Sequence, residues 1–109
     1  AHHLYIFGLS SKSFTEKHKE ECLKCLQKIR DKLTTEMIPH LITTTKDHPL
    51  LPAWTADHIL DEDKNLHRAY HALVPSFFII RPDGYIACRS MILSASYFKK
   101  YVASVFDIN

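Results

Sequence analysis

The chain has 109 residues, of which 46% are hydrophobic, and its 14 basic and 12 acidic side chains give a net charge of +2. This length predicts one domain over residues 1–109, large enough to fold without a disulfide or metal staple. The charge is too small to indicate a nucleic-acid partner or an anionic membrane surface, and no apolar run approaches the roughly 18 residues of a membrane span.

The numbers of cysteines and glycines indicate the cellular compartment and the kinds of binding loop to expect. Three cysteines, an odd number without framework spacing, are typical of a reducing compartment, and the N-terminus lacks a signal-peptide pattern. We therefore expect a cytoplasmic domain. Only two glycines argue against a loop that cradles phosphate through its backbone. His2 and His3 look like the remnant of a purification tag and receive no role.

The first half of the chain predicts a strand, a long helix and a second strand. Residues 4–9 are short and apolar on both sides, which favours a buried strand. Polar residues 10–13 are expected to cap a helix over residues 14–33, whose apolar positions fall on one stripe. Pro39 marks a turn into a β-branched strand at residues 40–46, and residues 47–52 form a loop.

The second half predicts a helix, a hairpin and a closing helix. Asp61 or Asp63 can cap a helix that runs through Ala72, with Leu66, Tyr70 and Leu73 facing inward. Residues 77–80 are apolar at every position, as in a central strand covered on both faces. A turn with proline, aspartate and glycine at 82–84 leads into a return strand over 85–88, and residues 94–106 form an amphipathic helix.

The predicted order is β-α-β-α-β-β-α. A helical crossover makes the first two strands parallel, whereas the turn at 82–84 makes the last two antiparallel. This arrangement predicts an α/β, thioredoxin-like domain with a mixed four-stranded sheet and helices on both faces. Pro75 stands before the third strand, where thioredoxin-like proteins often carry a cis proline, so the Val74–Pro75 bond is a candidate for that isomer.

In such a fold, Cys22 and Cys25 suggest a redox pair. A redox thiol needs the N-terminus of a helix, where free N–H groups and the helix dipole stabilise the thiolate. Cys22 lies about two turns into the predicted helix, and both sulfurs fall on its apolar stripe. The pattern therefore favours two packed core cysteines, and Cys88 is expected in the core as well. Thiol–disulfide exchange by Cys22 and Cys25 stays an alternative.

Eight histidines raise the question of a metal. Asp63, His67 and His71 follow one another at four-residue spacing on a predicted helix face, where two imidazoles can share zinc. No cysteine is near in sequence, and Arg68 stands where a metalloprotease has its glutamate. A solvated helix face is the better interpretation, and we predict no metal ligand and no catalytic residue.

Trp54 lies alone in a predicted loop, in an apolar setting flanked by proline. A tryptophan there more often covers the edge of the core than binds a ligand. The same loop could instead dock another protein, which gives a free-standing binding module as a further alternative.

Residues 61–89 resemble the C-terminal region of FAD-dependent aromatic-ring hydroxylases, the group of phenol hydroxylase, pentachlorophenol monooxygenase and the polyketide hydroxylases. The resemblance depends on a tyrosine followed by an apolar strand and an Arg-Pro-Asp-Gly-Tyr hairpin, here Tyr70, Arg81, Pro82, Asp83, Gly84, Tyr85 and Arg89. His71 and Cys88 depart from it, because the family usually has glycine and tryptophan there.

This resemblance implies a non-catalytic, thioredoxin-like accessory domain of a flavoprotein monooxygenase. FAD and NAD(P)H would then bind elsewhere in a longer parent enzyme, since no Gly-x-Gly-x-x-Gly occurs here. The implied partners are the N-terminal flavin domain of the same chain or a second subunit. The motif residues receive structural roles in the turn and strand edge, with Arg89 as a candidate partner of a carboxylate.

Overall fold

The structure is a computed structural model that describes residues 1–106, with five strands, three α-helices and one short 3-10 helix. None of these helices is both long and apolar enough to cross a membrane. The elements in chain order are β1 (His2–Leu9), α1 (Glu16–Lys32), β2 (Met37–Thr43), the 3-10 helix (Leu51–Ala53), β3 (Asp57–Leu60), α2 (Asn65–Ala69), β4 (Ser76–Ile80), β5 (Ile86–Ser90) and α3 (Ala95–Phe106).

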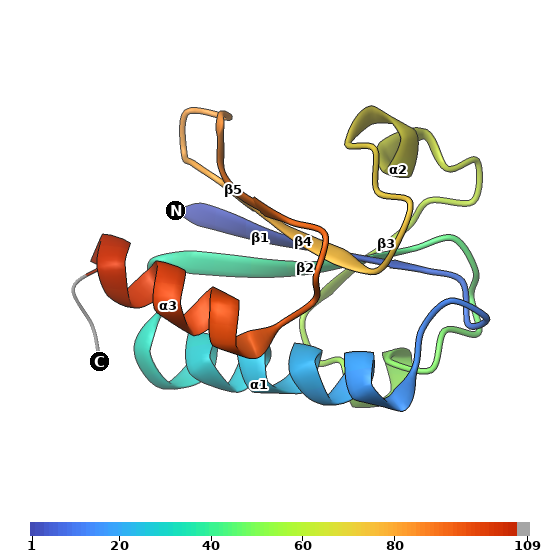
Figure 1. Ribbon diagram of the computed structural model, residues 1–109, viewed down its shortest axis with the longest axis horizontal. Helices are drawn as coiled ribbons and strands as arrows, with labels where there is room; N and C mark the ends of the chain where they lie inside the picture. Colours follow the sequence, from blue (N-terminus) through green and yellow to red (C-terminus); the bar gives the residue numbers. More distant parts are fainter. Residues whose placement is uncertain (107–109) are drawn as a thin grey trace.

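The strands form one mixed sheet in the order β3-β2-β1-β4-β5 (Figure 1). β1 and β2 are parallel, and β4 and β5 are antiparallel, which confirms both predicted pairings. The predicted number of four strands is wrong, because β3 adds a fifth strand parallel to β2. β3 has only four residues and begins with aspartate and histidine, so neither length nor apolar pattern identified it.

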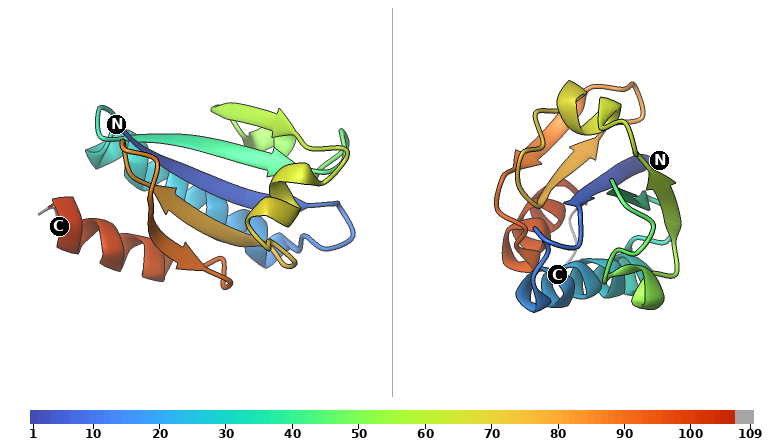
Figure 2. Two further views of the ribbon diagram at one scale, coloured as in Figure 1. Left: turned by 90° about the horizontal axis from the view of Figure 1, so that it is seen from above. Right: turned by 90° about the vertical axis from the view of Figure 1, so that its right-hand side faces the viewer.

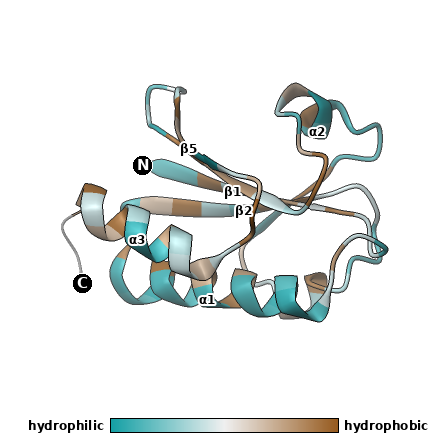
Figure 3. Ribbon diagram, viewed as in Figure 1, coloured by the Kyte–Doolittle hydropathy of each residue, from teal (hydrophilic) through white to brown (hydrophobic). Residues whose placement is uncertain are grey.

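Helices cover both faces of the sheet, as predicted (Figure 2). α1 and α3 lie together on one face, where the larger core cluster includes Leu4, Ile6 and Phe98. α2 lies on the opposite face, above a smaller cluster around Phe7 and Phe78. The alternation of side chains along β1 divides its residues between these two cores. In Figure 3 the hydrophilic residues of α1 face outward, as the amphipathic pattern requires.

Two side chains accept hydrogen bonds from backbone N–H groups at the N-terminal ends of α1 and α3. Thr15 caps α1, since its hydroxyl accepts the His18 N–H while the His18 ring accepts the Thr15 N–H. The prediction that residues 10–13 cap this helix is therefore wrong by a few residues. Glu21 in α1 accepts the backbone N–H of Ala95 at 3.1 Å and thereby ties the start of α3 to α1.

Two prolines differ from their predicted roles. Pro39 lies inside β2 and does not mark a turn before it. β3 pairs with β2 only from His40 onward, so β2 has one unpaired edge at Pro39, where a residue without an N–H is tolerated. The prediction of a cis bond before Pro75 is wrong, because every peptide bond in residues 1–106 is trans.

The hairpin is confirmed, whereas α2 is shorter than predicted. Gly84 has a φ of 91°, and its N–H donates to the carbonyl of Arg81 across the turn. β5 begins at Ile86, so Tyr85 still belongs to the turn. α2 ends at Ala69 and does not reach Ala72, which leaves Leu73 in an exposed segment instead of facing inward.

A buried histidine closes the corner at the end of β1. The His48 Nε2 donates to the carbonyl of Gly8 at 3.0 Å, and its Nδ1 accepts the N–H of Leu50 at 3.2 Å. A Cβ at Gly8 would lie 2.9 Å from the His48 Nε2, so this close approach requires glycine. Burial is the main reason why the pKa of His48 is lowered, and its ring is held neutral.

Candidate functional site

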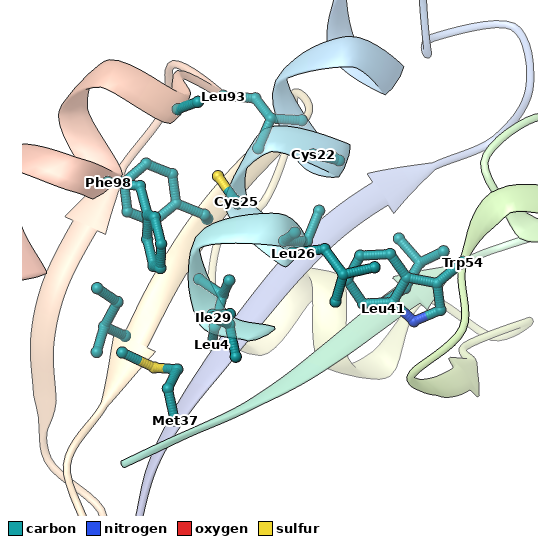
Figure 4. Packing of buried hydrophobic residues seen from close by; sticks show 14 of the residues in the cluster. Leu4, Cys22, Cys25, Leu26, Ile29, Met37, Leu41, Trp54, Leu93 and Phe98 are labelled. Carbon is teal, nitrogen blue, oxygen red and sulfur yellow. The ribbon is translucent and has the colours of Figure 1, made fainter. Parts of the chain in front are cut away.

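Cys22 and Cys25 lie in the interior of α1, far from its first turn, among apolar side chains of the larger core (Figure 4). Both are free thiols and both are buried, as the apolar stripe predicted. Burial raises the pKa of Cys25 to about 12 and raises the pKa of Cys22 well above its usual value. These thiols are therefore poor nucleophiles at neutral pH.

Cys88 differs from the other two cysteines. It is half-buried in β5, where it packs at the edge of the larger core, and burial raises its pKa as well. The residues between β1 and α1, where a redox thiol would meet free helix N–H groups, contain serine, lysine, phenylalanine and threonine.

The residues of the hairpin motif have structural contacts. Arg81 pairs with Asp83, and the Tyr85 N–H donates to the carboxylate of Asp83. The Arg89 guanidinium lies 5.7 Å from the ring centre of Phe78, and no ion pair of Arg89 occurs within residues 1–106. Tyr70 packs at the edge of the smaller core. The turn assignment was correct, whereas the expected carboxylate partner of Arg89 was wrong.

The stripe of Asp63, His67 and His71 does not form on one helix face. Asp63 precedes α2, and His71 follows it with a φ of 53°, so helical spacing does not apply to either residue. No group of three or more potential metal ligands of the His, Cys, Asp and Glu types comes together within residues 1–106. The interpretation as a solvated face is also wrong for His67, which is only 5% exposed.

His67 instead belongs to a buried pair with Asp61. Its Nδ1 lies 2.8 Å from the Asp61 carboxylate, which also accepts the backbone N–H groups of Leu66 and His67. Burial opposes the charge on Asp61, but these hydrogen bonds outweigh it and lower the pKa of the carboxyl. The N-cap position of α2 is Lys64, which makes no side-chain cap, so neither predicted aspartate is the N-cap residue. The Asp61 carboxylate nevertheless satisfies two N–H groups of the first turn and orients the His67 ring.

A second histidine network crosses the sheet and was missed, because His3 had been set aside. The His3 Nδ1 lies 2.8 Å from the His40 Nε2, and the His40 Nδ1 lies 2.6 Å from the Asp57 carboxylate. Burial and the neighbouring His40 lower the pKa of His3. Parallel pairing of the first two predicted strands could have brought His3 near His40, whereas Asp57 lies on β3, which no pattern predicted.

The ring of Trp54 covers the edge of the core. It is buried, and its ring N–H donates to the carbonyl of Asp57 at 2.8 Å. The interpretation that it covers the core edge is confirmed, whereas docking of a partner by its loop stays a prediction without a test. The exposed apolar side chains gather elsewhere.

A groove opens where three segments meet beside the first turns of α1. It has a volume of about 730 Å³ and is bounded by α1 with its lead-in, the segment before β4 and the segment before α3. Leu73, Val74 and Ile92 line it and are 79%, 45% and 60% exposed. The link from α2 to β4 is correspondingly hydrophobic in Figure 3. This surface is therefore a hollow in which exposed apolar side chains gather.

A smaller cavity of about 250 Å³ adjoins this groove at Ser13 and Leu73. It lies beyond the ends of the parallel strands β1 and β2, beneath α2, a common position for ligand sites in sheets of this kind. Its wall consists of Leu9, Ser10, Ser13, Thr44, Lys64, His67, Arg68, Ala72 and Leu73.

Comparison with known proteins identifies the fold. The thioredoxin domain of a thiol-disulfide oxidoreductase from Bacteroides vulgatus matches with a TM-score of 0.65 and 17% identity, over 93% of this chain and 79% of that one. The chain has a thioredoxin-like fold. Yeast Sco1 also matches, with a TM-score of 0.58 and 14% identity over 94% of this chain and 84% of that one. No protein-family model and no curated protein sequence matches the chain.

These comparisons overturn the resemblance to flavin hydroxylases. The matching structures include a thiol-disulfide oxidoreductase domain and Sco1, and the identification as the C-terminal domain of an aromatic-ring hydroxylase is wrong. The hairpin motif that suggested it is explained by local turn chemistry, which unrelated proteins share. FAD, NAD(P)H and a flavin-domain partner were implied by that resemblance alone and stay predictions without a test.

Proposed function

We propose that this domain binds an extended peptide segment in the groove between α1, the segment before β4 and the segment before α3. The observation that carries the proposal is the gathering of Leu73, Val74 and Ile92, three strongly exposed apolar side chains, in one concave surface. Exposed apolar side chains in a cluster are typical of interaction sites, whereas singly scattered ones are ordinary.

The walls of the groove favour a particular occupant. Val74 precedes a proline, which disfavours helical backbone at Val74, so this wall is not helical. Apolar side chains of the partner would cover Leu73 and Ile92. Lys17 lines the groove beside Glu21, and Lys24, which lies outside the lining, is also within 4 Å of the same carboxylate, so two cations share one anion at this rim. An extended apolar peptide with a flanking carboxylate complements both features.

Two valines of nearly equal exposure provide a matched test. Val74 lies in the groove and is 45% exposed, whereas Val105 lies on α3 outside it and is 47% exposed. Peptides selected from a random library on the wild-type domain should bind the Val74→Asp variant at least about tenfold more weakly, because a buried charge is costly. Fluorescence polarisation with labelled peptides measures the difference.

Val105→Asp should leave that affinity unchanged. Equal affinities of the two variants for every selected peptide, or a library that yields no binder, would refute the proposal. Circular dichroism of both variants verifies that the folded state is retained.

Thiol–disulfide exchange by Cys22 and Cys25 is the second candidate. It is favoured by their spacing of one helical turn and by the shared fold with a thiol-disulfide oxidoreductase. Burial and the raised pKa values oppose it. A Cys25 thiol with a pKa of about 12 should react with iodoacetamide about a thousandfold more slowly than a free thiol at neutral pH. If Cys22 or Cys25 were alkylated in the native state as fast as in the urea-unfolded chain, thiol–disulfide exchange would become the preferred function.

A further inference from the structure

The cavity beneath α2 has the size and the wall of a site for a small polar ligand. Its volume of about 250 Å³ lies below the roughly 300 to 1,000 Å³ of pockets for drug-sized molecules. It is bounded by the ends of β1 and β2 and by one side of α2, which are held together by backbone pairing and by the hydrogen bonds that the Asp61 carboxylate accepts. The surrounding structure therefore holds the cavity open.

The charges in the cavity wall are of one sign. Lys64 and Arg68 supply two cationic side chains, and no carboxylate belongs to the wall. Neither Lys64 nor Arg68 forms an ion pair within residues 1–106, and the contact of Arg68 with the Asn65 side chain is long, at 3.4 Å. Their charges are therefore free to bind an anion.

His67 adds a buried polar atom without a partner. Three buried side-chain polar atoms lack a hydrogen bond in the described part of the chain, and only the His67 Nε2 belongs to a residue of this wall. Such an atom is destabilising unless a ligand or water satisfies it. Asp61 accepts the Nδ1–H, so Nε2 can donate when the ring is protonated and can accept from a P–OH group when it is neutral.

From these features we propose that the cavity binds a phosphate group through Lys64, Arg68 and His67. The hydroxyl groups of Ser10, Ser13 and Thr44 also belong to the wall and can donate to the remaining oxygens. A phosphate offers about two negative charges and three strong acceptor oxygens, more than a planar carboxylate can present to so many donors. The site uses side chains, which is consistent with the scarcity of glycine for a backbone cradle.

Titration of the ¹⁵N-labelled domain with inorganic phosphate, at constant ionic strength maintained with chloride, tests the site. We expect saturable shifts of the amides of Ser10, Ser13 and Arg68 in NMR spectra. The Lys64→Ala/Arg68→Ala variant should bind at least about tenfold more weakly. Lys32→Ala/Lys100→Ala removes the same charge at exposed positions outside the cavity and should bind as the wild type does.

Methyl phosphate in a parallel titration distinguishes a free phosphate from a phosphate carried on a carbon. Equal binding of the two probes supports a site for the phosphate group alone. Preferential binding of methyl phosphate supports a phosphate monoester whose carbon contacts Leu9, Ala72 or Leu73 in the same wall. Binding of neither probe, shifts that chloride reproduces, or equal affinities of the two double variants would overturn the proposal.

Discussion

The two faces of the sheet differ in how completely they are covered. The 17-residue α1 and the 12-residue α3 close one face with hydrocarbon, and even the two thiols there are buried. The five-residue α2 covers the other face only in part and leaves the buried Asp61–His67 pair next to a cavity. Long amphipathic helices build a closed core, whereas a short helix leaves polar groups and space that a ligand can use.

The largest effect is expected on the closed face. Phe98 is completely buried, with its ring 6.1 Å from that of Phe77. Phe98→Ala should lower the free energy of unfolding by about 3–5 kcal/mol, because it removes contacts and leaves a void. Urea unfolding followed by circular dichroism measures the loss. Tyr97→Ala, at the exposed neighbouring position, should change it by no more than about 0.5 kcal/mol, and similar losses for both would contradict the closed packing.

A smaller loss is expected beneath α2. Asp61→Asn removes a carboxylate that accepts three hydrogen bonds and should lower the free energy of unfolding by about 2 kcal/mol. Asp63→Asn makes the same change two residues away, at an exposed position, and is the control. If the two variants were equally stable, Asp61 would not hold α2 in place.

The Asp61→Asn and Asp63→Asn variants should also differ in how their stability depends on pH. The pKa of Asp61 is lower in the folded chain than its ordinary value of 3.8, so the unfolded chain binds more protons at low pH. The stabilisation by Asp61 is fully present above that ordinary value and is lost as pH falls through the lower folded value. Urea midpoints measured between about pH 5 and 2 should fall less steeply for Asp61→Asn than for Asp63→Asn. Parallel curves would contradict the assignment.

The smallest effect is expected at the groove. Leu73 is 79% exposed, so Leu73→Ser should change the free energy of unfolding by less than about 0.5 kcal/mol. Peptide binding, in contrast, should weaken. A loss of stability above about 1 kcal/mol would show that the Leu73 side chain is packed in the unbound domain and is not available to a peptide.

Local patterns in the sequence predicted the closed face well. The stripe along α1 predicted the burial of Cys22 and Cys25, because helical periodicity alone places those residues toward the sheet. The turn at residues 82–84 was predicted because Gly84 needs a positive φ. Both predictions depend on residues that are neighbours in the chain.

The open face depends on contacts between distant residues, which no local pattern reveals. Leu73 fits the apolar stripe of a longer second helix, yet α2 ends at Ala69 and Leu73 is exposed. His67 pairs with Asp61, which lies six positions earlier in the chain. Because α2 begins only at Asn65, Asp61 lies outside the helix, and a search for partners at four-residue helical spacing does not find this pair. The smaller cavity is likewise formed by three separate parts of the chain, residues 9–13, Thr44 and residues 64–73.

The close approach of His48 to Gly8 makes the end of β1 sensitive to mild acid. The ring uses one nitrogen as a donor to Gly8 and the other as an acceptor from Leu50, so a second proton would set two N–H groups against each other. The pKa of His48 is lowered from an ordinary value near 6.5, and its stabilising effect is lost as pH falls from there through the lower folded value. The turn between β1 and α1, which supplies Ser10 and Ser13 to the cavity, should therefore loosen in weakly acidic solution before the carboxylates of the domain take up protons.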